Sequence, residues 1–205
     1  MANGQANHSS PSNPAPSQQQ ALDILLAEHH ALETVLDTLL GVVTASRQGP
    51  INQRSLDCQP IRLMLDYIRT VPDRLHHPKE DQTLFARLRQ RTGEFDQVLD
   101  KLSAQHREGE RWLQKMEAAL DRFDSGFPPA FLEFAGLLET YCDHQVAHLR
   151  LEETIVFPAA SACLLDEDWA DVAAAFGANG DPRYAAEEKN EAVLYGKIAR
   201  LDLPA

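Results

Sequence analysis

One stretch constrains this 205-residue chain more than any other: residues 76–81 read HHPKED. Two imidazoles are followed within one helical turn by two carboxylates. On an α-helix, residues i and i+4 lie on one face, so His76 and Glu80 are expected to point the same way. The same spacing returns at His148 and Glu152. Because a nitrogen and an oxygen donor on one helix face can bind a cation together, the sequence predicts a metal site built from helices.

Apolar residues at three- and four-residue steps predict four helices around these motifs. The expected ranges are 21–47, about 57–88, 94–123 and 129–165. Glycine- and proline-containing turns separate them, and the histidines His29 and His106 fall on the apolar stripes of the first and third helices. Four long helices with short connections are typical of an up-down four-helix bundle, so the predicted fold is all-α.

The flanking segments have a different composition. Residues 1–20 are rich in Asn, Gln, Ser and Pro with almost nothing to bury, which predicts a disordered polar tail. The bundle is expected to span residues 21–165. Residues 166–205 are predicted to form a C-terminal helical extension that packs on the bundle, with a short helix ending near residue 176 and a further helix over 183–200.

Two prolines fall inside the second predicted helix. Pro72 is expected to kink it, and Pro78 removes a backbone hydrogen bond within the HHPKED stretch. A proline in a helix interior costs on the order of 3 kcal/mol. If a new helix began at Pro78, His76 would lie outside it and would not share a face with Glu80.

Composition narrows the classes of partner. Asp and Glu number 31 and Lys and Arg 19, which gives a net charge of −12 without a basic stripe, so nucleic acid is not expected as a partner. No apolar run approaches the roughly 18 residues of a membrane helix, and the polar N-terminus does not resemble a signal peptide. Three cysteines without CxxC spacing suit a reduced compartment, so we expect a cytoplasmic protein.

The predicted donor atoms limit which metals could bind. Every predicted helix carries at least one histidine, and buried imidazoles and carboxylates need polar partners or a metal. Imidazole and carboxylate donors without thiolate suit iron, manganese or zinc. Two carboxylates able to bridge, together with four or more imidazoles, suit two ions a few ångströms apart.

These residues resemble the hemerythrin-like, HHE cation-binding family over about residues 21–165. Its pattern is a first-helix histidine, a His-x-x-x-Glu, a third-helix histidine and a second His-x-x-x-Glu. The matching residues here are His29, His76, Glu80, His106, His148 and Glu152. The resemblance implies an oxo- or hydroxo-bridged di-iron centre in which Glu80 and Glu152 bridge the ions. Zinc and manganese are the alternative metals.

One position departs from the family's oxygen carriers. Those proteins have a second histidine one turn after the third-helix histidine. This chain has Glu110 there, and the difference argues against a role as an oxygen carrier. The missing ligand is expected to come from His77, His144 or Glu110. His144 is favoured because it precedes His148 by one turn on the same helix face.

Further polar residues flank the expected ligands. His30 and His77 are expected either beside the ligands or at the rim of the site. Asp81 and Glu153 are expected to orient ligand histidines through hydrogen bonds.

The resemblance implies binding or sensing of dioxygen, nitric oxide or peroxide, or the handling of iron. A second hypothesis is a di-iron enzyme that breaks down peroxide, handles nitric oxide or repairs iron–sulfur clusters. A third is a helical interaction module with one structural zinc. The sequence indicates no particular protein partner.

Overall fold

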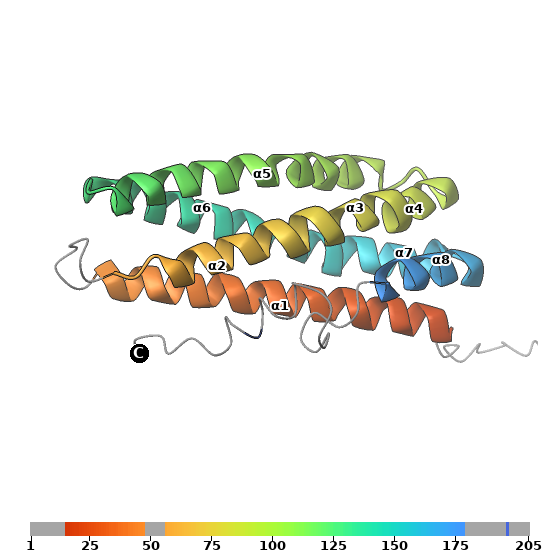
Figure 1. Ribbon diagram of the computed structural model, residues 1–205. Helices are drawn as coiled ribbons and strands as arrows, with labels where there is room; N and C mark the ends of the chain where they lie inside the picture. Colours follow the sequence, from red (N-terminus) through yellow and green to blue (C-terminus); the bar gives the residue numbers. More distant parts are fainter. Residues whose placement is uncertain (1–14, 48–55, 179–195, 197–205) are drawn as a thin grey trace, which may run out of the picture.

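The computed structural model describes residues 15–47, 56–178 and 196, and this part of the chain is helical with no strand. Its helices form four long runs, and these lie side by side in Figure 1. The first is α1 (Pro16–Arg47) and the third is α5 (Asp96–Asp124). The predicted all-α, up-down four-helix bundle is therefore confirmed.

The second and fourth runs are composite. The second helical run contains α2 (Gln59–Ile68), η1 (Arg69–His76), α3 (His77–Lys79), η2 (Glu80–Phe85) and α4 (Ala86–Arg91). The fourth helical run contains α6 (Pro129–Leu151), η3 (Glu152–Val156) and α7 (Phe157–Cys163). A short helix, α8 (Asp166–Gly177), follows where it was predicted and lies beside α1 (Figure 1).

The N-terminal boundary differs from the expectation. α1 begins at Pro16, inside the stretch 1–20 that the sequence assigns to a polar tail. Proline is well tolerated in the first turn of a helix, and the glutamines that follow are good helix formers. Most of the predicted tail, and the helix expected over 183–200 apart from residue 196, lie outside the described residues.

The prolines do not break the second helical run. η1, which contains Pro72, is π-helical, and the backbone N–H of His77 donates to the Pro72 carbonyl five residues earlier. A single π turn accommodates one extra residue without ending the helix. The run continues through Pro78, so His76 and Glu80 stay on one face. The expectation that a new helix at Pro78 would separate them does not apply.

The apolar core is divided into two clusters. In α1, Leu25 belongs to one cluster and Leu32 to the other, with His29 between them. In α5, Leu102 belongs to one cluster and comes before His106. The α5 residues of the other cluster all come after His106. Histidines thus interrupt the apolar stripes at one level of the bundle, and a polar layer lies between the two clusters.

Ion pairs hold α8 against the second helical run. Arg91 Nε lies 2.7 Å from Asp168 Oδ2, and the same oxygen accepts a hydrogen bond from the backbone N–H of Leu165 at 2.9 Å. Asp168 therefore caps α8 and joins it to α4. The contact between Arg91 and Asp168 thus holds α8 in place at one end of the bundle.

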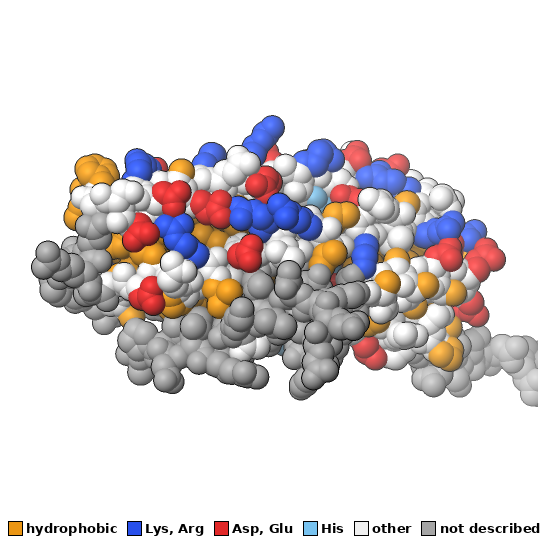
Figure 2. Space-filling model, viewed as in Figure 1, with side chains coloured by type: hydrophobic (Ala, Val, Ile, Leu, Met, Phe, Trp, Pro, Cys, Tyr) orange, Lys and Arg blue, Asp and Glu red, His pale blue; other side chains and the backbone are white. Residues whose placement is uncertain are grey.

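The described surface carries interspersed charges. On the face in Figure 2, basic side chains alternate with acidic ones. Arg69, for example, pairs with Glu117 of α5 at 2.7 Å. None of the helices that the structure describes combines the length and apolar character needed to cross a membrane.

Candidate metal centre

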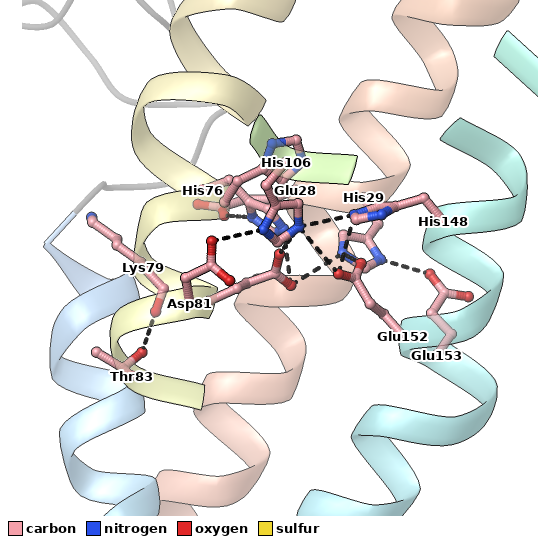
Figure 3. Close-up of polar contacts among 12 residues, drawn as sticks. Glu28, His29, His76, Lys79, Asp81, Thr83, His106, His148, Glu152 and Glu153 are labelled. Atoms are coloured by element: carbon pink, nitrogen blue, oxygen red, sulfur yellow. Dashed lines mark hydrogen bonds and ion pairs between the residues drawn. The ribbon is translucent and has the colours of Figure 1, made fainter. Parts of the chain in front are cut away.

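All four helical runs send donor side chains into the polar layer (Figure 3). Their side chains are at most 5% exposed, and both glutamates are fully buried. The seven residues are His29, His76, His77, Glu80, His106, His148 and Glu152. The six ligands expected from the sequence are thus brought together, and His77 joins them.

The imidazoles form two groups. The first histidine group is His29 and His76, whose donor atoms lie within 4.8 Å of each other and of Glu80. The second histidine group is His77, His106 and His148, whose donor atoms also lie within 4.8 Å of one another. The Nε2 atoms of His106 and His148 approach to 3.2 Å, so both point at one position.

Each buried glutamate faces both groups. Glu80 places Oε1 3.3 Å from His76 Nε2 and Oε2 3.6 Å from His106 Nε2. Glu152 places Oε2 3.5 Å from His29 Nε2 and Oε1 3.1 Å from His148 Nε2. One oxygen of each carboxylate is therefore directed at each histidine group, which is the arrangement that two bridged ions require.

Six of the converging donor atoms lack hydrogen-bond partners among the described residues. Nε2 of His29, Nε2 of His76 and all four carboxylate oxygens of Glu80 and Glu152 are buried without one. A buried polar atom without a partner costs about 1–3 kcal/mol, and more when it is charged. So many unpaired donors converging on one space fit metal cations, which would pair with all of them.

The outward-facing nitrogens of four histidines are hydrogen-bonded. The Nδ1 pairs are His29 with Glu153 at 2.9 Å, His76 with Glu28 at 2.6 Å, His106 with Asp81 at 3.0 Å and His148 with Gln105 at 3.0 Å. Such partners fix the ring and leave Nε2 as the free donor. Asp81 and Glu153 lie where the sequence places them. Glu28 and Gln105 were not expected, and the one signal for them is that each directly precedes a ligand histidine.

His77 is held less tightly. Its Nδ1 lies 3.4 Å from Asp73 Oδ1 without a hydrogen bond, and its ring stacks on that of His106 with centroids 4.2 Å apart. Asp73 reaches this position because residue 109 is a glycine: a Cβ there would lie 2.7 Å from Asp73 Oδ1. Neither Asp73 nor Gly109 was expected to support the site.

The other candidates for the missing ligand do not join the converging donors, although His144 lines the same small cavity as His77. His144, which the sequence favoured, is exposed, and its ring centroid lies 5.4 Å from that of Trp112. Glu110 is exposed and its Oε2 lies 3.5 Å from Arg69 Nε. His30 is also exposed. His77 is therefore the residue that brings a third imidazole to His106 and His148.

Burial and neighbouring charges act in opposite directions on these groups. Burial disfavours the charged forms of His76 and His106, but nearby carboxylates outweigh it, so the pKa of His76 lies well above its usual value and that of His106 rises to about 9. Burial and the neighbouring imidazoles hold the pKa of His77 well below its usual value. Nearby histidines outweigh the burial of Glu152 and hold its pKa well below the usual range. Without metal, protonated histidines thus compensate the buried carboxylates.

Aromatic side chains pack against the outer edges of the imidazoles. Phe157 stacks on His29 with centroids 5.4 Å apart, and Phe176 of α8 meets His76 edge-on at 5.6 Å. Both phenylalanines are buried. They cover this side of the polar layer with apolar surface.

The family comparison agrees with this geometry. The model of the hemerythrin HHE cation binding domain matches residues 20–160. No curated protein and no solved structure matches the chain. The matched range contains all seven converging donors, and these can hold metal cations. The chain belongs to the hemerythrin family of HHE cation-binding domains.

Proposed function

We propose that this chain binds two iron ions, one at each histidine group, and uses them to bind or sense a small ligand such as dioxygen, nitric oxide or peroxide. The observation that carries the proposal is the orientation of Glu80 and Glu152. Each carboxylate directs one oxygen to each group at 3.1–3.6 Å from a histidine nitrogen. A single ion would use one oxygen of each carboxylate and leave the others buried and unpaired.

The number of donors favours iron over zinc. Two imidazoles and two bridging oxygens give the first ion four protein donors, and three imidazoles with two oxygens give the second five. Five donors exceed the tetrahedral set of a structural zinc site, and none of the converging residues is a cysteine. Mixed imidazole and carboxylate donors suit iron.

Six-coordinate ions would retain positions for a small ligand. With four and five protein donors, the chain would not fill either coordination shell, so a bridging oxygen and a small ligand could complete them. A bound pair of irons supplies redox chemistry and sites for a diatomic molecule or peroxide. The chain orients the donors through hydrogen bonds to four of the imidazoles, and the phenylalanines exclude bulk water.

Metal analysis and absorption spectroscopy of freshly purified protein test the proposal. About two irons per chain and a near-ultraviolet band that bleaches with dithionite are expected. His144→Ala is the matched control, because this histidine lies on the same helix as His148 but outside both groups. One zinc per chain, or a colourless protein, would contradict the proposal and favour a structural metal.

A further inference from the structure

α8 covers one side of the first histidine group. Its residue Phe176 is fully buried, and the ring meets that of His76 edge-on with centroids 5.6 Å apart. α8 packs against both α1 and η2, so it lies over the seam between the helical runs that carry His29 and His76 (Figure 1). The match to the family domain ends at residue 160, so this cover is an addition to the domain.

The described residues close the first histidine group from the surface. His29 is 1% exposed and His76 is 4% exposed. The cavity beside them, between α1 and η1, has a volume of only about 10 Å³, the least that holds one water molecule. A larger cavity, between α5 and α6, borders the second histidine group instead. Part of the wall must therefore move before an ion can reach or leave the first histidine group.

Charged contacts hold the first turn of α8. Arg91 of α4 donates from Nε to Asp168 Oδ2 at 2.7 Å and from Nη2 to Asp168 Oδ1 at 3.0 Å. The same Nη2 lies 3.1 Å from Oε1 of Glu167. Asp168 is buried, and a bidentate pair with a buried carboxylate is stronger than an ordinary surface pair. Arg91 therefore fixes one end of α8, and Phe176 lies at the other.

Apolar side chains dock the rest of α8, with one unfavourable feature. Trp169, Val172 and Phe176 belong to the same core cluster. The indole Nε1 of Trp169 is buried without a hydrogen-bond partner among the described residues. Because water would pair with this N–H if α8 moved outward, the unpaired group raises the free energy of the docked helix. It thereby lowers the cost of opening.

The connection between α7 and α8 permits such a movement. Leu164 and Leu165 alone separate the two helices, and both have extended backbone, with ψ angles of 146° and 166°. Hinges are typically a few residues at the ends of elements, and the edge of a fold opens locally more often than its core. α8 can therefore swing away as a unit while the bundle stays folded.

We propose that α8 is a gate through which metal enters and leaves the first histidine group, with the Arg91–Asp168 pair as its latch. When α8 swings outward, Phe176 leaves the ring of His76, and the edge of the first histidine group opens to solvent. The proposal rests on the proposed function only in placing an ion at this group, and it applies to any metal bound there.

Metal release and hydrogen–deuterium exchange in the full chain test the proposal together. Protein loaded with ferrous iron without oxygen is mixed with an excess of a colorimetric ferrous chelator, and exchange of the α8 amides is followed by mass spectrometry. Arg91→Gln removes the latch but leaves Asp168 to cap α8. Both α8 exchange and the release of one of the two irons should accelerate by about two- to fivefold, the factor expected for a partly exposed ion pair.

Arg62→Gln is the matched control. Arg62 and Arg91 are 31% and 30% exposed, and each contacts two carboxylates, at 2.7 and 3.2 Å for Arg62 and at 2.7 and 3.1 Å for Arg91. Arg62 pairs with Asp121 and Asp124 at the opposite end of the bundle from α8 (Figure 1). Both α8 exchange and iron release in Arg62→Gln should match wild type.

Three results would overturn the gate. Faster α8 exchange with unchanged metal release would show that α8 opens but is not the route. Unchanged exchange in Arg91→Gln would show that Arg91 is not the latch. Equal acceleration in Arg62→Gln would assign release to general loosening of the bundle.

The same measurements separate the gate from the di-iron proposal. If the chain takes up zinc instead of iron, zinc release to a colorimetric dye is followed in the same variants, so the gate is tested although the di-iron proposal has failed. A chain that binds neither metal would refute both.

Discussion

Replacing Gly109 by alanine tests the support beneath the second histidine group. A Cβ at this position would lie 2.7 Å from Oδ1, 2.9 Å from Oδ2 and 3.0 Å from Cγ of Asp73. All three distances are to atoms of one buried carboxylate. The whole Asp73 side chain must therefore move, because rotating one oxygen away would not relieve the clash. Asp73 lies beside His77, and the shift is expected to loosen that imidazole.

The magnitude follows from two opposing effects. Alanine is favoured over glycine in a helix interior by about 1 kcal/mol. Overpacking a buried site costs about 1–3 kcal/mol. Gly109→Ala should therefore destabilise the protein by about 0–2 kcal/mol. Gly136→Ala on α6, where nothing lies within 4 Å of the added Cβ, should stabilise it by up to about 1 kcal/mol.

Urea denaturation of both metal-free variants is the assay. The difference between the two free energies of unfolding isolates the clash, and about 1–3 kcal/mol is expected. Iron content should fall only in Gly109→Ala. If Gly109→Ala were as stabilising as Gly136→Ala and bound as much iron, Asp73 would not be packed against this glycine and would not support His77.

Three further perturbations test the site. His77→Ala should lower iron content while His144→Ala leaves it at the wild-type level; equal iron content in both would refute the role given to His77. Glu152→Gln should bind at most one ion per chain, because the amide cannot bridge as a carboxylate does, and two bound ions would contradict the bridging role. Because folding raises the pKa of His106 from 6.5 to about 9, the metal-free protein gains full stability from it below about pH 6.5 and loses it as the pH rises through 9. Metal affinity should rise over the same range, since the proton must leave; urea midpoints and metal titrations at each pH check both trends.

The helices, and most of the side chains that converge between them, could be predicted from the sequence because both follow from helical periodicity. His29 and His106 stand at core positions of their helices, so the burial of their side chains could be predicted from the apolar stripe alone. The His-x-x-x-Glu spacing likewise put His148 beside Glu152, and these atoms lie 3.1 Å apart.

The sequence offered His77 as one of three candidates for the missing ligand but could not select it over His144. Successive helical residues point about 100° apart, so an argument from one face favours His76 and cannot place its neighbour. In a bundle, however, each helix faces two neighbours. His76 reaches Glu28 of α1, and His77 stacks on His106 of α5. That distinction depends on which helices are adjacent.

The outer supports depend on the same tertiary packing. Glu28 and Gln105 contact histidines 48 and 43 residues away along the chain. Asp73 requires the absence of a side chain at Gly109 on a different helix. No spacing within one helix encodes such contacts.

Anomalous diffraction at the iron edge from crystals of the iron-loaded protein tests the central claim most directly. Two peaks about 3.5–4 Å apart are expected. One should lie within bonding distance of His29 and His76, the other of His106 and His148, with Glu80 and Glu152 spanning both. A single peak, or two peaks that share neither glutamate, would contradict the carboxylate-bridged pair.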